Sequence, residues 1–130
     1  MSGRPFLEPD FNNLTELKQW RYDQIDARTG ELIKQGFQHQ GKTFSLSQNA
    51  QINILGLDNA KDDPAMAYPI KYNTIDDLDS YDVVDAADVH TMYMAALGTK
   101  KAHVDSGTAL KQQVRDAVDI AAVNAIVDNR

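Results

Sequence analysis

The chain has 130 residues, a net charge of −6 at pH 7 and no cysteine. This length suits one domain with a modest core, and the lack of cysteine excludes a disulfide scaffold and a thiolate zinc site. The acidic balance argues against binding to the phosphate backbone of nucleic acids, and no apolar run reaches the length of a membrane span. We therefore expect a soluble protein made in the cytoplasm, with neither nucleic acid nor a membrane as a partner.

The negative charge is concentrated in the middle of the chain. Residues 47–99 carry two basic and nine acidic side chains, whereas residues 1–46 carry six of each and residues 100–130 carry five basic and four acidic ones. An acidic segment of this kind favours solubility and basic partner surfaces.

Residues 1–12 predict an extended N-terminal arm. Its two prolines fix φ and disfavour helix in the residues before them. The arm carries three large apolar side chains, Phe6, Leu7 and Phe11. A frayed terminus and an arm seated in a groove of its own domain or of a neighbour both fit this pattern. Because a domain of this size has a limited core, we predict that these three side chains contact a partner.

A long helix is predicted over residues 14–34. Asn13 followed by Glu16 is a variant of the capping box, and Gly36 is a C-terminal stop. An apolar stripe at helical spacing runs along the helix and is interrupted by two arginines: Leu14, Leu17, Ile25 and Leu32, with Arg21 and Arg28. Trp20 lies off this stripe, so we predict a core or subunit contact for it and count it among the partner-binding residues.

Residues 36–57, GFQHQGKTFSLSQNAQINILGL, predict a β-hairpin that leads into a short helix. Phe37 and Phe44 flank a glycine-containing turn at residues 39–42. A hairpin alone is marginal in water, so the helix after it is expected to cover it. We predict that both phenylalanines are buried.

The short helix is predicted from Gln48 to Leu55, with Ser45 or Ser47 as its N-cap and the following glycine as its end. Ile52 and Leu55 are three residues apart and share a helix face. We expect this face to pack against the hairpin phenylalanines.

Residues 57–67 are expected to form a loop because of their composition. Residues 68–74 combine aromatic and β-branched residues and predict a third strand. Pro69 would place this strand at a sheet edge or would mark its start.

An aspartate-rich segment, DDLDSYDVVDAAD, occupies residues 76–88 and holds six aspartates. A calcium loop of the EF-hand type needs a glycine and a bidentate glutamate that this segment lacks. We favour a turn followed by a helix cap, with Asp85 as the N-cap and Asp88 complementing the helix dipole.

Residues 86–118 predict a second long helix. Its apolar positions repeat in steps of four and three, but His103 and Gly107 occupy the middle of this seam. Gly98 and Gly107 each cost about 1 kcal/mol relative to alanine, so the helix would either kink there or turn its middle toward water or a partner. A last short helix capped by Asp119 would follow.

These elements together predict a mainly helical α+β fold. It would contain an N-terminal helix, a small β-hairpin plus an edge strand, a short helix, a long C-terminal helix and a terminal short helix. Residues 1–12 would form the arm, and residues 13–130 would form a single α+β domain.

Neither a catalytic site nor a metal site is predicted. His90 and His103 are 13 residues apart, which is about 220° around a continuous helix, and His39 lies in a turn far along the chain. The sequence has no G-x-S-x-G nucleophile elbow and no glycine-rich phosphate loop of common spacing. We therefore expect no catalytic residues, no cofactor and no bound metal, and we expect that the protein is not an enzyme.

The segment LKQWRYDQIDARTGELIKQGFQHQGKTFSLSQNAQINILGL resembles the opening of a phage tail domain family of unknown function. The pattern is a basic helix with spaced arginines, a Gly-Phe pair, a hairpin with a central glycine and a short helix rich in serine and glutamine. The residues that match it are Arg21, Ile25, Arg28, Gly36, Phe37, Gly41, Phe44, Ser47, Gln51 and Ile54. The strand, acidic turn and long histidine-containing helix that follow are also similar. The chain departs from the pattern in a short, aspartate-rich linker at residues 57–67 and in Tyr72, which stands where the family has a tryptophan.

This resemblance implies a structural or adaptor protein of a bacteriophage tail, located in the virion at the baseplate or where the tail fibres attach. Its partners would be other tail, baseplate or fibre proteins, with multiple copies in each virion, and a homo-oligomer stays open. The alternative is a non-virion assembly factor, a chaperone for a tail fibre or baseplate protein. The resemblance implies no catalytic residue.

Overall fold

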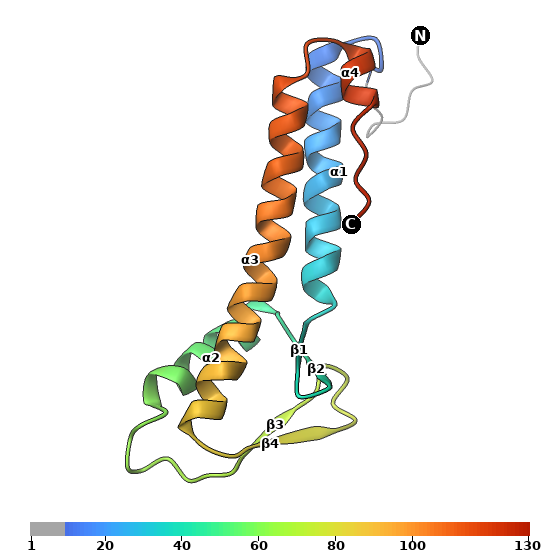
Figure 1. Cartoon of the computed structure of the whole chain (residues 1–130). Helices are drawn as coiled ribbons and strands as arrows, with labels where there is room; N and C mark the ends of the chain where they lie inside the picture. The colour runs from blue at the N-terminus through green and yellow to red at the C-terminus, as the bar shows by residue number, and fades with distance from the viewer. Residues whose placement is uncertain (1–9) are drawn as a thin grey trace. The chain divides into compact units, whose positions relative to one another are not determined.

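The computed structural model describes residues 10–130, which fold as an α+β protein with four helices and two antiparallel hairpins (Figure 1). The predicted fold class is confirmed. In chain order the elements are α1 (Leu14–Lys34), β1 (Phe37–His39), β2 (Lys42–Phe44), α2 (Gln48–Ala60), β3 (Ile70–Asn73), β4 (Ser80–Val83), α3 (Ala86–Asp116) and α4 (Ile120–Asn124).

The chain divides into two compact units. The central unit is Glu31–His103, and the terminal unit combines Val104–Arg130 with the described part of Met1–Gly30. The helices α1 and α3 each contribute residues to both units. The predicted Asn13 cap of α1 is confirmed, since its Oδ1 accepts a hydrogen bond from the Glu16 backbone N–H at 3.1 Å.

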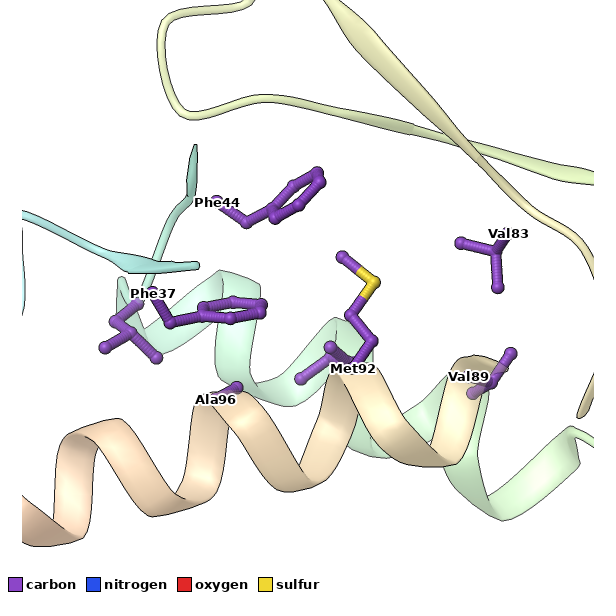
Figure 2. Packing of buried hydrophobic residues seen from close by; sticks show 8 residues of the cluster. Phe37, Phe44, Val83, Val89, Met92 and Ala96 are labelled. Atoms are coloured by element: carbon purple, nitrogen blue, oxygen red, sulfur yellow. The ribbon is translucent and has the colours of Figure 1, made fainter. Parts of the chain in front are cut away.

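The core of the central unit is built around the β1–β2 hairpin. Phe37 and Phe44 face each other across this hairpin, and both are almost fully buried, as predicted. Figure 2 shows them beside Met92 and Ala96, which project from α3. The buried side chain that α2 contributes to this cluster is Ile54.

Glycines make the hairpin geometry possible at two places. Gly36 has φ +81°, and a Cβ there would lie 2.1 Å from the Phe44 carbonyl oxygen, so β1 can begin against β2 only without a side chain. Gln40 and Gly41 have φ +51° and +76°, the backbone of a two-residue hairpin turn with positive φ at both central positions. The predicted glycine-containing turn is confirmed.

Two predictions about α2 are wrong. The helix does not end at Gly56 but continues to Ala60, because its last turns carry Leu57 onto the core. The predicted inward face is also wrong, since Ile54 is 3% exposed whereas Ile52 and Leu55 are 61% and 43% exposed. The helix α2 has apolar residues on two sides, and the side with Ile54 packs against the phenylalanines of the hairpin. The Ser47 cap is confirmed by the 3.1 Å hydrogen bond from the Ala50 N–H to Ser47 Oγ.

A second hairpin, β3–β4, follows the loop after α2. The predicted third strand is confirmed as β3, but its partner β4 lies inside the aspartate-rich segment and was not predicted. Val83 of β4 is fully buried, while Asp82 beside it is exposed. The remaining aspartates form the turn and cap that were favoured. Asp76 Oδ1 accepts hydrogen bonds from Thr74 Oγ1 at 2.7 Å and from the Leu78 N–H at 3.0 Å.

The helix α3 is continuous through Gly98 and Gly107, so of the two alternatives left open by the sequence the structure shows no interruption at either glycine. Gly107 lies in the terminal unit, where a Cβ would come within 2.6 Å of Thr29 Oγ1. It allows α3 and α1 to approach closely. The predicted Asp85 cap is confirmed, since its Oδ1 accepts from the Asp88 N–H at 2.8 Å.

The terminal unit buries Leu17, Ile25, Val114 and Val123, and Asp119 caps α4 as predicted. The segment after α4 runs along α1 (Figure 1). The two arginines that interrupt the α1 stripe hold this segment by its backbone: Arg21 Nη2 donates to the Ile126 carbonyl at 2.9 Å, and Arg28 Nε donates to the Arg130 carbonyl at 2.8 Å.

Candidate functional site

The predicted partner-binding residues fall in two groups. Phe6 and Leu7 lie outside the described residues. Phe11 packs edge-to-face on Trp20, with ring centroids 5.4 Å apart and an interplanar angle of 88°. Half of the Phe11 surface remains exposed, and Trp20 is partly buried. Phe11 therefore contacts the helix α1 that follows it, and a partner contact for these residues stays a prediction.

The most buried polar cluster joins three elements of the central unit. His39 was predicted in a turn but ends β1, where it is 6% exposed and its Nε2 lies 2.9 Å from Asp88 Oδ1 of α3. Tyr81 of β4 donates from its hydroxyl to Asp88 Oδ2 at 2.6 Å, and the Val84 N–H donates to the same oxygen at 3.1 Å. Both carboxylate oxygens thus accept from groups of the protein itself.

The hydrogen bonds of this cluster stabilise the ionised form of Asp88 and the protonated form of Tyr81. Burial by itself would raise the pKa of Asp88, but the hydrogen bonds from Tyr81, His39 and the Val84 N–H together hold it below its usual value. The hydrogen bond to the Asp88 carboxylate, with burial, raises the pKa of Tyr81 to about 12. The cluster links β1, β4 and the start of α3, and it leaves no carboxylate oxygen without an internal donor.

The three histidines do not converge. His39 is paired with Asp88 in the core, and His90 Nδ1 lies 2.9 Å from Asp58 Oδ1 on the surface. Within residues 10–130 there is no group of three or more histidine, aspartate or glutamate side chains that could hold a metal ion. None of the described helices is long and apolar enough to cross a membrane.

An open apolar depression lies between α2 and the first half of α3. Ile52 and Leu55 of α2 face Tyr93 and Leu97 of α3 across a volume of about 370 Å³. We call this surface the apolar groove. The buried Ile54 and Ala96 also line it.

One end of the apolar groove is fixed by a polar contact. Lys100 Nζ donates to Gln51 Oε1 at 2.7 Å, and the Gln51 amide donates to the Leu46 carbonyl at 2.7 Å. These bonds tie α3 to the start of α2 and hold the walls of the groove in place.

The walls of the groove carry large aliphatic side chains that are unusually exposed. Besides Ile52 and Leu55, Leu97 of α3 is 46% exposed. Contiguous exposed apolar side chains rimmed by polar ones mark interaction surfaces more often than scattered ones do. Sequence reasoning missed this surface because it assigned Ile52 and Leu55 to the core. The available signal was a second apolar pair at helical spacing, Ile54 and Leu57, which could equally have formed the buried face.

Comparison with known protein families gives a match over most of the chain. The family described as "Domain of unknown function (DUF4376)" matches residues 14–128. Neither the curated proteins nor the solved structures contain a match to the chain. Since the family match runs from the first residue of α1 to Asp128 and includes every described helix and strand, the chain belongs to the DUF4376 family.

Proposed function

We propose that this protein is a structural or adaptor component of a bacteriophage tail, in the baseplate or fibre-attachment region, and that it acts by docking to other proteins through the apolar groove. The observation that carries the docking role is the groove itself, with exposed Ile52, Leu55 and Leu97 on rigid helices. The assignment to a phage tail is supported by the resemblance of the helix–hairpin–helix sequence.

The groove is suited to binding because its walls are already ordered. Fully burying a large aliphatic side chain contributes about 1.5–3 kcal/mol, and these three side chains retain roughly half of that gain for a partner. Helices held by the Gln51–Lys100 contact lose little freedom when a partner binds, so more of the gain appears as affinity.

Docking fits the described residues better than catalysis does. The buried carboxylate of Asp88 accepts from three protein donors, which leaves it little capacity for a substrate. The acidic middle of the chain, with nine acidic and two basic residues at 47–99, favours a partner whose surface around the contact is basic.

The test is the protein content of purified virions of the phage that encodes this chain. We expect the protein in mass spectra of virions, in several copies per particle. Ile52→Glu should reduce its incorporation, whereas Leu78→Glu should not, because Leu78 is 86% exposed and lies outside the groove. Absence from purified virions would refute the structural role. If the protein then copurified with an unassembled fibre or baseplate protein, it would act as an assembly factor.

A further inference from the structure

Within the part of the chain that the structure describes, β3 has an edge that no other strand covers. On its paired edge the Thr74 N–H donates across the hairpin to the Asp79 carbonyl at 3.0 Å. Backbone groups alternate in direction along an antiparallel strand, so in this register Tyr72 also faces β4, whereas Lys71 and Asn73 face outward. The outward N–H and C=O groups of Lys71 and Asn73 have no hydrogen-bond partner within residues 10–130.

Just beyond β3, the same outward edge already makes one hydrogen bond of the kind that joins strands. The Ile75 N–H donates to the Thr43 carbonyl of β2 at 3.0 Å. After β2 the chain turns into α2, and a trough of about 420 Å³ lies between the start of α2 and β3. We call it the β3 trough. Its lining includes Ser45, Asn49 and Asn53 on the α2 side and Lys71, Asn73 and Ile75 on the β3 side.

The α2 wall of the β3 trough carries two side-chain amides. Asn49 and Asn53 are four residues apart on the helix, so they share a face, and both are exposed. Neither amide has a hydrogen-bond partner among the described residues. Each asparagine offers two N–H donors and one carbonyl acceptor, which match the C=O and N–H groups along the edge of an extended peptide. The two walls therefore present complementary groups to both edges of a single strand.

The lining of the β3 trough is nearly neutral although the chain is acidic. Among the described residues that line it, Lys71 is the one cation and Asp77 is the one anion, and the others are amides, hydroxyls or apolar side chains. A charged side chain placed between these walls would lose water without gaining a counter-charge of its own. A proline facing β3 would bring no N–H to the edge. The trough therefore favours an uncharged segment without proline.

We propose that the β3 trough binds an uncharged extended segment of another protein, which adds as a strand to the outward edge of β3. The main chain of this segment exchanges hydrogen bonds with Lys71 and Asn73 on one edge and with the amides of Asn49 and Asn53 on the other. The site lies on a different side of α2 from the apolar groove, whose α2 wall is Ile52 and Leu55. It is therefore independent of the proposed role in a phage tail.

The first test is amide hydrogen exchange of the full chain, measured residue by residue by NMR without any ligand. The amides of Tyr72 and Ile75 should be protected, whereas those of Lys71 and Asn73 should exchange rapidly at every protein concentration. Protection of Lys71 and Asn73 in the dilute chain would show that the edge is already filled. Protection that appears only as the chain is concentrated would assign the edge to a second copy. Either result would overturn the proposal.

The second test is a titration of the full chain with the peptide acetyl-Thr-Val-Thr-Gln-Thr-amide, which is uncharged and rich in strand-forming residues. It should protect the amides of Lys71 and Asn73 and bind with a dissociation constant below about 1 mM. The same peptide with methylated backbone nitrogens should not bind, because it has no N–H to donate. Absence of binding by the first peptide, or equal binding by both, would refute strand addition.

The third test uses variants of the two walls. The double variant Asn49→Ala with Asn53→Ala should weaken peptide binding at least about fivefold, whereas Asn59→Ala, on α2 but outside the trough, should not change it. Lys71→Pro should abolish binding because it removes the outward N–H, whereas Lys71→Gln keeps that N–H and should bind as wild type does. If Lys71→Pro does not fold, the double variant decides. A double variant that binds as tightly as wild type would overturn the proposal.

Discussion

Gly36 is the position where a single added methyl group should do the most damage. Its φ of +81° lies in the left-handed region, where an L side chain costs about 1–2 kcal/mol. A Cβ there would also lie 2.1 Å from the Phe44 carbonyl oxygen, and a backbone atom cannot rotate away as a side chain can. To relieve the overlap β2 must shift and draw the fully buried Phe44 ring partly out of its site. Since complete removal of a buried phenylalanine costs about 3–5 kcal/mol, we expect Gly36→Ala to cost about 3 kcal/mol or more.

Gly41→Ala is the matched control for this prediction. Its φ of +76° carries the same backbone strain, but a Cβ there would meet nothing within 4 Å. Gly41→Ala should therefore cost only the strain, about 1–2 kcal/mol. Urea unfolding followed by circular dichroism gives the free energy of unfolding for both variants. If the two losses agree within about 0.5 kcal/mol, the close approach of Phe44 is not what requires glycine at position 36.

Four further predictions concern stability. Phe44→Ala should lower the free energy of unfolding by about 3–5 kcal/mol in urea titrations, and a loss below about 1 kcal/mol would place the ring outside the core. Because the folded protein holds the pKa of Asp88 low, the stabilisation from its carboxylate is present above the unfolded pKa near 4 and is lost as pH falls through the folded pKa. The advantage of wild type over Asp88→Asn should therefore shrink as pH falls below about 5 in acid unfolding, and an advantage that does not change with pH would contradict this. The pKa of Tyr81 is raised to about 12, so its hydroxyl stabilises the folded protein fully below about pH 10 and loses this effect as pH rises through 12. The advantage of wild type over Tyr81→Phe in the free energy of unfolding should therefore disappear in alkali. A difference that does not change with pH would contradict this. Gly107→Ala should lower the melting temperature despite the better helix propensity of alanine, because its Cβ would lie 2.6 Å from Thr29 Oγ1; a higher melting temperature in calorimetry would count against the close helix approach.

The features that the sequence predicted correctly depend on few residues close together. Asn13, Ser47 and Asp119 each cap a helix whose first turn lies directly after them, so capping could be inferred without knowing the rest of the fold. The burial of Phe37 and Phe44 was also predictable, because large aromatic residues on facing strands of a short hairpin have few other ways to leave water.

The features that the sequence did not predict depend on distant segments. Helix α2 is apolar on two sides, and only the position of the hairpin decides that Ile54 is buried and Ile52 exposed. The apolar groove could not be predicted for the same reason. In the sequence Arg21 only interrupts an apolar stripe. Its role was not visible there because its hydrogen-bond acceptor, the Ile126 carbonyl, comes from a segment 105 residues away. The strand β4 was not predicted because it lies in the aspartate-rich segment, although the alternation of Tyr81, Asp82 and Val83 has the period of a half-buried strand.

The assembly of the terminal unit from both ends of the sequence has a consequence for synthesis on the ribosome. The central unit closes over short spans, such as the 49 residues between His39 and Asp88, whereas Lys18 reaches the Arg115 carbonyl across 97 residues. Translation therefore delivers every residue of the central unit before the partners of the first turns of α1 exist. Until then Leu17 and Ile25, which become fully buried, have no cover from their own chain. During that interval these two apolar side chains lack the segment that completes their unit in the folded protein.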